Sequence, residues 1–225
     1  LALSPRTAVL DGTADFVVNL ADLPALSAAE ATEFLDSNVL TSGMEILLSQ
    51  AFARLAGTGS SSGIYKLSES MGGGKTQSMI VAGILARFPN LALLMPFHDP
   101  LAKAKPDVVA AFTGRATDKK VWVAIGDALG VTFAPDRAPS ETEWRDALKD
   151  RAALILLDEL AFYLVHAASQ GSKEDGTRAA TLAGIALTNL FGAIRDYKEC
   201  RRCVIVIADL QKDWEQGAEE LSRIM

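Results

Sequence analysis

The sequence predicts an α/β fold with a mostly parallel sheet. Two runs, "AALILLDEL" at 152–160 and "CVIVIADL" at 203–210, are continuously apolar apart from acidic residues near their ends. Continuous rather than alternating apolarity indicates strands that are covered on both faces. Segments with helical periodicity separate these runs from two β-prone segments, residues 63–67 and 107–114. This alternation predicts one sheet between two layers of helices.

Length, composition and charge exclude several classes of protein. The chain has 225 residues, of which 49% are hydrophobic, so it can bury a sizeable core. A net charge of −6 argues against a surface devoted to nucleic acid, although a local basic patch stays open. No apolar run reaches the ~18 residues of a spanning helix, so we expect a cytoplasmic protein. Because the first residue is Leu1, we expect it to be a piece of a longer chain.

The chain has two cysteines, Cys200 and Cys203, in a C-x-x-C arrangement. Such a pair is half of a zinc site, but there is no second pair. The two histidines, His98 and His166, lie far away in the sequence. The pattern therefore favours a cysteine in a turn followed by a cysteine in a buried strand.

A helical lead-in precedes the main domain. Residues 1–26 are expected to be irregular, with a short extended piece at 16–20. Ser27 with Glu30, and Ser42 with Glu45, have the spacing of helix-starting capping boxes. The second helix ends at Gly57, and the small polar segment 57–63 is a loop. We expect residues 1–57 to pack on a core formed by 58–225.

Further helices follow from periodicity and from helix-ending residues. The helix after the glycine-rich segment stops at Pro89, and three prolines interrupt residues 90–106, where "LALLM" fits either a strand or a buried helical turn. Asp118 is positioned to cap a helix that Gly130 ends. Ser140 with Glu143 begins another helix. The last predicted helices are 181–197 and 213–225.

The segment "KLSESMGGGKTQS", residues 66–78, lies between a predicted strand and a predicted helix. Glycines let backbone N–H groups approach phosphate oxygens, and the helix N-terminus favours an anion there. Lys75 is expected to contact the β- and γ-phosphates, and the Thr76 hydroxyl to bind Mg²⁺. The predicted nucleotide contacts are Met71, Gly72, Gly73, Gly74, Lys75, Thr76 and Gln77. Glu69 stands where the usual phosphate-loop pattern has its first glycine, and the alternative is a flexible turn.

The run "LILLDE" supplies the acids that such a loop requires. We expect Asp158 to bind Mg²⁺ through a water and Glu159 to orient and deprotonate the attacking water. Two adjacent acids favour ATP hydrolysis over phosphoryl transfer to a small molecule. The alternative is a helix N-terminus whose acids complement the macrodipole.

One strand is expected between the loop and the acid pair, and another after the acid pair. In P-loop ATPases of the additional-strand group, the later strand inserts between the loop strand and the acid strand. Asp209, at the end of this later strand, is the candidate residue for sensing the γ-phosphate. Capping of the following helix is an equal alternative for Asp209.

These segments resemble the P-loop ATPases of domain-of-unknown-function family 499, relatives of the AAA-type ATPases. The resemblance rests on "FLDSNVLTSGMEILLSQAFARLAG", "LSESMGGGKTQSM", "VVAAFTGR", "LILLDELAFYL", "ALTNLFGAI" and "VIVIADL". It implies a three-layer P-loop fold and an ATPase serving a DNA-directed or anti-phage assembly, with DNA-modifying or helicase partners. The family usually has His after the loop threonine, where this chain has Gln77.

The same resemblance implies that the domain is incomplete, because AAA-type ATPases add a further core strand and a helical lid. They also commonly use an arginine finger from a neighbouring subunit of a homo-oligomer. Arg201, Arg202 and Arg223 are the candidate fingers, and solvated surface charge is the alternative for each. Two other functions stay open at this point: a nucleotide-gated interaction module with negligible turnover, and a small-molecule kinase.

Overall fold

A computed structural model describes residues 18–59, 62–67, 74–93, 95–116 and 118–208. Its centre is a four-stranded, all-parallel sheet with the order β1-β4-β3-β2. The strands are β1 (Ile64–Leu67), β2 (Val108–Thr113), β3 (Ala153–Asp158) and β4 (Cys203–Ala208). The last strand in sequence therefore lies between the first and third, as the sequence predicts.

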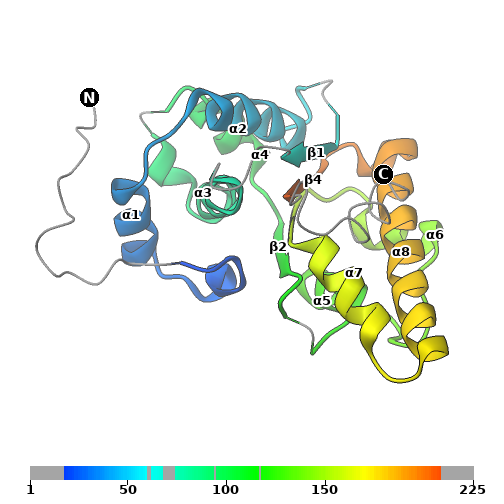
Figure 1. The fold of residues 1–225 in the computed structure, drawn as a ribbon. Helices are drawn as coiled ribbons and strands as arrows, with labels where there is room; N and C mark the ends of the chain where they lie inside the picture. The colour runs from blue at the N-terminus through cyan, green and yellow to red at the C-terminus, as the bar shows by residue number, and fades with distance from the viewer. Residues whose placement is uncertain (1–17, 60–61, 68–73, 94, 117, 209–225) are drawn as a thin grey trace, which may run out of the picture.

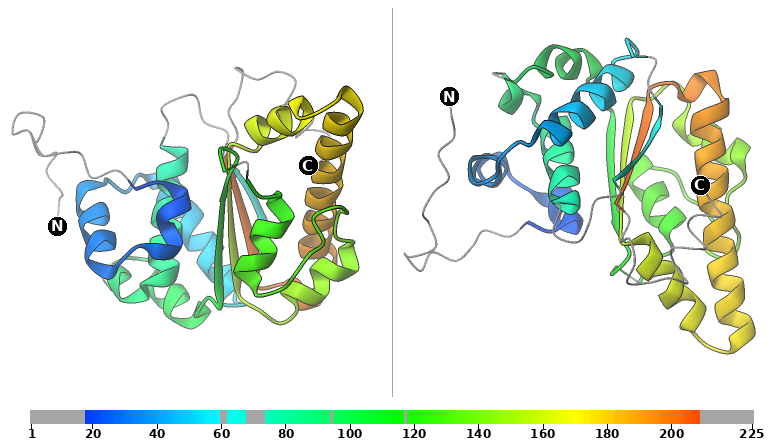
Figure 2. Two further views of the ribbon diagram at one scale, coloured as in Figure 1. Left: turned by 90° about the horizontal axis from the view of Figure 1, so that it is seen from below. Right: turned by 45° about the horizontal axis from the view of Figure 1, so that its top comes forward.

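Helices cover both faces of this sheet (Figures 1 and 2). One layer comprises η2 (Leu20–Ala25), α1 (Ala28–Ser37), α2 (Ser42–Leu55), α3 (Lys75–Arg87), η3 (Pro89–Ala92) and α4 (His98–Ala104). The other layer comprises α5 (Val121–Leu129), α6 (Glu141–Leu148), α7 (Leu160–Ser169), α8 (Lys173–Asp196) and η4 (Lys198–Cys200). The predicted α/β class and parallel sheet are confirmed.

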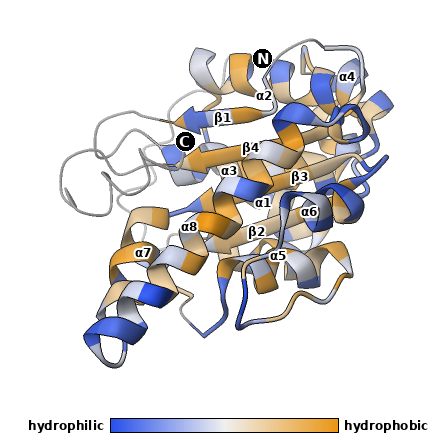
Figure 3. Ribbon diagram, turned by 90° about the vertical axis from the view of Figure 1, so that its right-hand side faces the viewer, coloured by the Kyte–Doolittle hydropathy of each residue, from blue (hydrophilic) through white to orange (hydrophobic). Residues whose placement is uncertain are grey.

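Two apolar cores share the central strands. In β3, Leu154 and Leu156 face the first helical layer, while Ile155 and Leu157 face the second. Every residue of β3 and β4 is buried, and the hydropathy colouring places these apolar strands beneath helices with hydrophilic outer surfaces (Figure 3). Successive side chains of a strand point to opposite faces, so two buried faces require an unbroken apolar run.

The segment before β1 packs on the first face of the sheet. The main chain of α3 comes so close to η2 that a β-carbon added at Gly83 would lie 2.2 Å from Leu23 Cδ2. The Arg87 guanidinium donates hydrogen bonds to the carbonyls of Leu23 and Leu26. The expectation that residues 1–26 are irregular is therefore wrong for 20–25, where apolar contact and arginine capping stabilise a 3-10 helix.

The helix starts confirm some predicted caps and correct others. Capping boxes begin α1 at Ser27 and α6 at Ser140, and Gly130 ends α5 in the left-handed conformation. The cap of α2 is Thr41, whose hydroxyl accepts from Met44 N, rather than Ser42. Asp118 does not cap α5, which begins three residues later.

The reason lies in another helix. The Tyr163 hydroxyl accepts the backbone N–H of Val121 at 3.2 Å and so satisfies the first turn of α5 without a side-chain cap. This partner comes from α7, which the sequence did not predict. Tyr163 is also in edge-to-face contact with Phe112 of β2, with ring centroids 5.2 Å apart.

Other helices differ from expectation. α4 contains Pro100, which is tolerated because it lies in the first turn, where backbone N–H groups have no partner within the helix. "LALLM" begins inside η3 rather than in a strand. α8 starts at Lys173 rather than near residue 181. The predicted helix 213–225 lies outside the described residues, as does part of the predicted extended piece 16–20.

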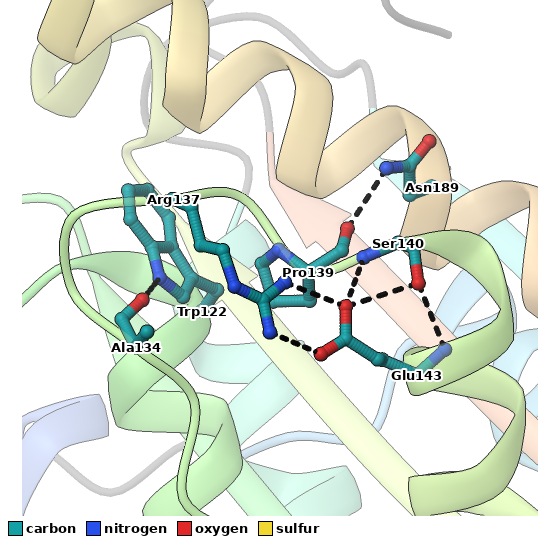
Figure 4. A network of polar contacts seen from close by, with 7 residues as sticks. All are labelled: Trp122, Ala134, Arg137, Pro139, Ser140, Glu143 and Asn189. Carbon is teal, nitrogen blue, oxygen red and sulfur yellow. Dashed lines mark hydrogen bonds and ion pairs between the residues drawn. The ribbon is translucent and has the colours of Figure 1, made fainter.

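A polar network fixes the segment that leads into α6 (Figure 4). Arg137 holds Glu143 with two hydrogen bonds of 2.8 and 2.6 Å. Asn189 of α8 donates to the Pro139 carbonyl at 2.8 Å, and the Trp122 indole donates to the Ala134 carbonyl at 2.9 Å. These contacts attach residues 134–143 to the second helical layer.

Candidate active site

The carboxyl ends of the four strands form one edge of the sheet. Thr113 is the register partner of Asp158, and Asp158 is the partner of Ala208, which in turn pairs with Leu67. Segments that leave these strand ends therefore start side by side, in the place where open parallel sheets bind ligands. The glycine-rich segment leaves from Leu67, and the acid pair stands at the end of β3.

The helix α3 begins at this edge. Its N-cap is Gly74, with a φ of 68° and a ψ of 23°, a left-handed conformation that favours glycine. Lys75, Thr76 and Gln77 form the first turn. The Gly74 carbonyl accepts from Ser78 N at 2.8 Å and from the Ser78 hydroxyl at 2.9 Å, and no side chain caps the turn. A helix start of this kind presents N–H groups to an anion.

The Thr76 hydroxyl donates a 2.6 Å hydrogen bond to Asp158 Oδ2. Asp158 Oδ1 accepts from the backbone N–H of Glu159 at 2.9 Å. Burial raises the pKa of the Asp158 carboxyl, while the Thr76 hydrogen bond and the Lys75 charge act in the opposite direction. The phosphate-loop helix and the acidic strand end therefore meet through a hydroxyl and a buried carboxylate, only 6% exposed as a residue.

These two groups are hard oxygen donors of the kind that Mg²⁺ uses in nucleotide sites. In the described ranges, no three His, Cys, Asp or Glu side chains gather closely enough to bind a metal by themselves. The donor set therefore fits an ion that shares its coordination with phosphates and water. Cys200 and Cys203 are both buried and unoxidised, and the described chain brings no zinc ligands to them.

Glu159 is held by residues that sequence reasoning missed. Arg115 Nε lies 2.8 Å from both Glu159 carboxylate oxygens, and the Thr113 hydroxyl donates to Oε2 at 3.2 Å. The hydrogen bond to Glu159 raises the pKa of Arg115. Glu159 itself has a φ of 53° and a ψ of 35°, an unusual conformation for a residue with a side chain.

A second missed contact ties the lead-in to the first turn of α3. Asn38, the C-cap of α1, is buried and donates from Nδ2 to the Phe34 carbonyl at 2.5 Å. Its Oδ1 accepts from the Gln77 amide. Gln77 thus contacts the junction between α1 and α2 in the described structure.

The structure brings Lys75, Thr76, Asp158 and Glu159 to one edge, as predicted from their motifs. The other candidates Glu69, Met71, Gly72, Gly73, Asp209 and Arg223 lie outside the described residues. Arg201 is exposed. Arg202 is neither a finger nor a solvated charge, because its guanidinium donates to the Leu55 and Ala104 carbonyls at 2.8 Å each.

The position of Arg115 had a signal in the sequence. It follows "AAFTG", which ends the strand next to the acidic strand, so parallel pairing alone would have placed it near Glu159. Among the described helices none has the length and apolarity needed to cross a bilayer. Searches of protein-family models, curated proteins and solved structures find no match to this chain.

Proposed function

We propose that this chain binds ATP with Mg²⁺ and hydrolyses it, and that its fold is a P-loop NTPase of the additional-strand group. The observation that carries the proposal is the 2.6 Å contact between the Thr76 hydroxyl and Asp158. It joins the start of a glycine-preceded helix to an acidic strand end. The strand order β1-β4-β3-β2 supports the same fold.

Each residue has a distinct role in this proposal. The N–H groups at the start of α3 and the Lys75 ammonium bind the phosphate chain. Thr76 and Asp158 hold the metal ion, which when bound neutralises charge that develops on the phosphates. Glu159 orients the attacking water and accepts its proton.

The test compares the wild-type chain with Glu159→Gln. We expect both to bind ATP in the presence of Mg²⁺ by calorimetry, because the substitution leaves Lys75, Thr76 and Asp158 in place. Phosphate release should fall by about 10²–10⁴-fold in the variant, since it loses a general base. Glu143→Gln is the matched control, because Glu143 is also a carboxylate bound by an arginine, but at the start of α6.

Two results would contradict the proposal. Absence of Mg²⁺-dependent ATP binding would exclude the nucleotide site. Equal phosphate release by wild type and Glu159→Gln would exclude the catalytic role of Glu159. The resemblance to family 499 supports a DNA-directed role, so phosphate release is measured with and without double-stranded DNA.

A second candidate is a nucleotide-gated interaction module with negligible turnover. The engagement of Glu159 by Arg115 and Thr113 favours it, because a carboxylate held in this way is not available to water. An interaction module would bind ATP with the same affinity in wild type and Glu159→Gln, and neither would release phosphate above background.

A further inference from the structure

The two side chains that hold the Glu159 carboxylate come from one side of the site. Thr113 is the last residue of β2, and Arg115 lies in the turn that follows. The sheet order β1-β4-β3-β2 places β2 at the edge beyond β3, on the side away from β1. The glycine-rich segment leaves from β1, so the carboxylate is bound on the side of β3 opposite to the phosphate loop.

Several features fix Glu159 in this position. Arg115 Nε is shared by both carboxylate oxygens, and Thr113 donates to one of them. The Arg115 guanidinium also lies 5.8 Å from the Phe162 ring centroid, above the first turn of α7. Gly114, between the two donors, donates its N–H to the Asp158 carbonyl at 2.9 Å. The turn after β2 is thus attached to both acids.

A carboxylate in this arrangement cannot act as a general base without first changing partners. A base must lie within hydrogen-bond reach of the proton that it removes, and here Arg115 and Thr113 occupy the carboxylate oxygens. The side chain of Arg115 is 74% exposed and that of Glu159 is 18% exposed. Water and salt therefore reach the pair, and the contact can separate without burying an unpaired charge.

We propose that Arg115 is a positioning residue that withholds Glu159 from the nucleotide, and that turnover requires the two side chains to separate. This inference rests on the proposed ATPase function and adds a residue that controls it. It assigns to Arg115 an inhibitory effect on kcat, in contrast to the stimulatory effect of an arginine finger.

The experiment measures nucleotide affinity and steady-state phosphate release for Arg115→Gln and Arg115→Lys. Exposed ion pairs contribute modestly, so Arg115→Gln should raise kcat by about twofold to fivefold with KM unchanged. Arg115→Lys keeps the charge but not the planar fork, and should fall between wild type and Arg115→Gln. The double variant Arg115→Gln/Glu159→Gln should be as slow as Glu159→Gln alone.

Ionic strength provides a readout that a purely structural role would not move. Salt screens an exposed pair, so wild-type kcat should rise between low and high salt more than that of Arg115→Gln. Arg137→Gln is the matched control, because Arg137 also holds a carboxylate with two hydrogen bonds and is 59% exposed, but at the start of α6 (Figure 4). It should leave kcat and its salt dependence unchanged.

The outcomes separate the two proposals. An unchanged or lower kcat in Arg115→Gln, with normal hydrolysis by wild type, overturns the withholding role and leaves the ATPase proposal standing. If wild type binds ATP without hydrolysing it, hydrolysis by Arg115→Gln supports withholding, and its absence there overturns it. If neither chain binds ATP, the proposed function fails and the inference fails with it.

Discussion

Gly114 and the main chain of Glu159 are in closer contact than any side chain at position 114 would allow. A β-carbon built on Gly114 would lie 2.0 Å from the Glu159 carbonyl oxygen and 2.8 Å from its carbonyl carbon. Gly114 also donates its N–H to the Asp158 carbonyl at 2.9 Å. The glycine therefore sets how closely the turn after β2 approaches the proposed base.

Replacing Gly114 with alanine should move this turn away from Glu159. We expect a loss of about 1–3 kcal/mol in the free energy of unfolding, since the clash is with backbone and cannot be relieved by a rotamer change. Denaturant unfolding measures the loss, and phosphate release should fall with it. Gly130→Ala is the control, because Gly130 has a φ of +70° but nothing within 4 Å of its added β-carbon.

The control should cost about 1 kcal/mol, from backbone strain alone. It should leave phosphate release unchanged, because Gly130 ends α5 and belongs to no strand end. A Gly114→Ala chain with wild-type stability and wild-type turnover would contradict the steric argument.

Asp158→Asn should stabilise the metal-free chain at neutral pH. Burial raises the pKa of Asp158, so the folded chain binds this proton more tightly than the unfolded chain does. The free energy of unfolding therefore falls as pH rises through the window above the ordinary aspartate pKa of about 4. Asparagine has no charge to bury, and its amide can donate to Thr76 while its oxygen accepts from Glu159 N.

Thermal unfolding at several pH values measures this effect. We expect the Tm of Asp158→Asn to exceed that of wild type by about 2–4 °C at pH 7, and the difference to vanish near pH 3. Mg²⁺ with ATP should raise the Tm of wild type but not of the variant. A variant that is less stable than wild type at pH 7 without metal would contradict this reading of Asp158.

Much of the fold was predictable because the strongest patterns reflect burial. The unbroken apolar runs that became β3 and β4 gave both the parallel sheet and the acids at its edge. Capping boxes at Ser27 and Ser140 placed helix starts, since each cap is a local contact between residues three apart. The elements missed were those whose stability comes from distant partners, such as the start of α5 under Tyr163.

The candidate site divides in the same way. Lys75, Thr76, Asp158 and Glu159 belong to two recognisable motifs, whose meeting the strand order brings about. Arg115 and Asn38 belong to no motif, and their roles arise from pairing between strands and from packing of the lead-in on α3. Arg202 was misread because a charged residue in a turn gives no sign that two helix ends converge on it.

Arg202→Gln should destabilise the chain strongly for a residue in a turn. Its guanidinium donates to the carbonyls that end α2 and α4, which would otherwise have no partner from these donors. Hydrogen bonds to charged groups contribute about 1.5–3 kcal/mol, so we expect a loss in that range in denaturant unfolding. The neighbouring exposed Arg201, changed to Gln, should alter stability by less than about 0.5 kcal/mol.

This pair of variants also distinguishes a structural arginine from a finger. A finger in trans would reduce phosphate release without reducing stability, and its effect would depend on protein concentration. Arg202→Gln with wild-type stability and reduced turnover would therefore contradict the capping role.

Asn38 and Gln77 should be energetically coupled, because the Asn38 carbonyl accepts the Gln77 amide and its own amide is bound to Phe34. A double-mutant cycle with Asn38→Ala and Gln77→Ala measures this coupling in denaturant unfolding. We expect a coupling energy of about 0.5–1.5 kcal/mol. Gln77 lies in the first turn of α3, so Asn38→Ala should also weaken ATP binding although it contacts no predicted phosphate ligand other than Gln77. Asn19→Ala, an exposed asparagine that caps η2, is the control and should leave ATP affinity unchanged. Additive losses in the cycle, with unchanged ATP affinity in Asn38→Ala, would mean that the lead-in does not position the first turn of α3.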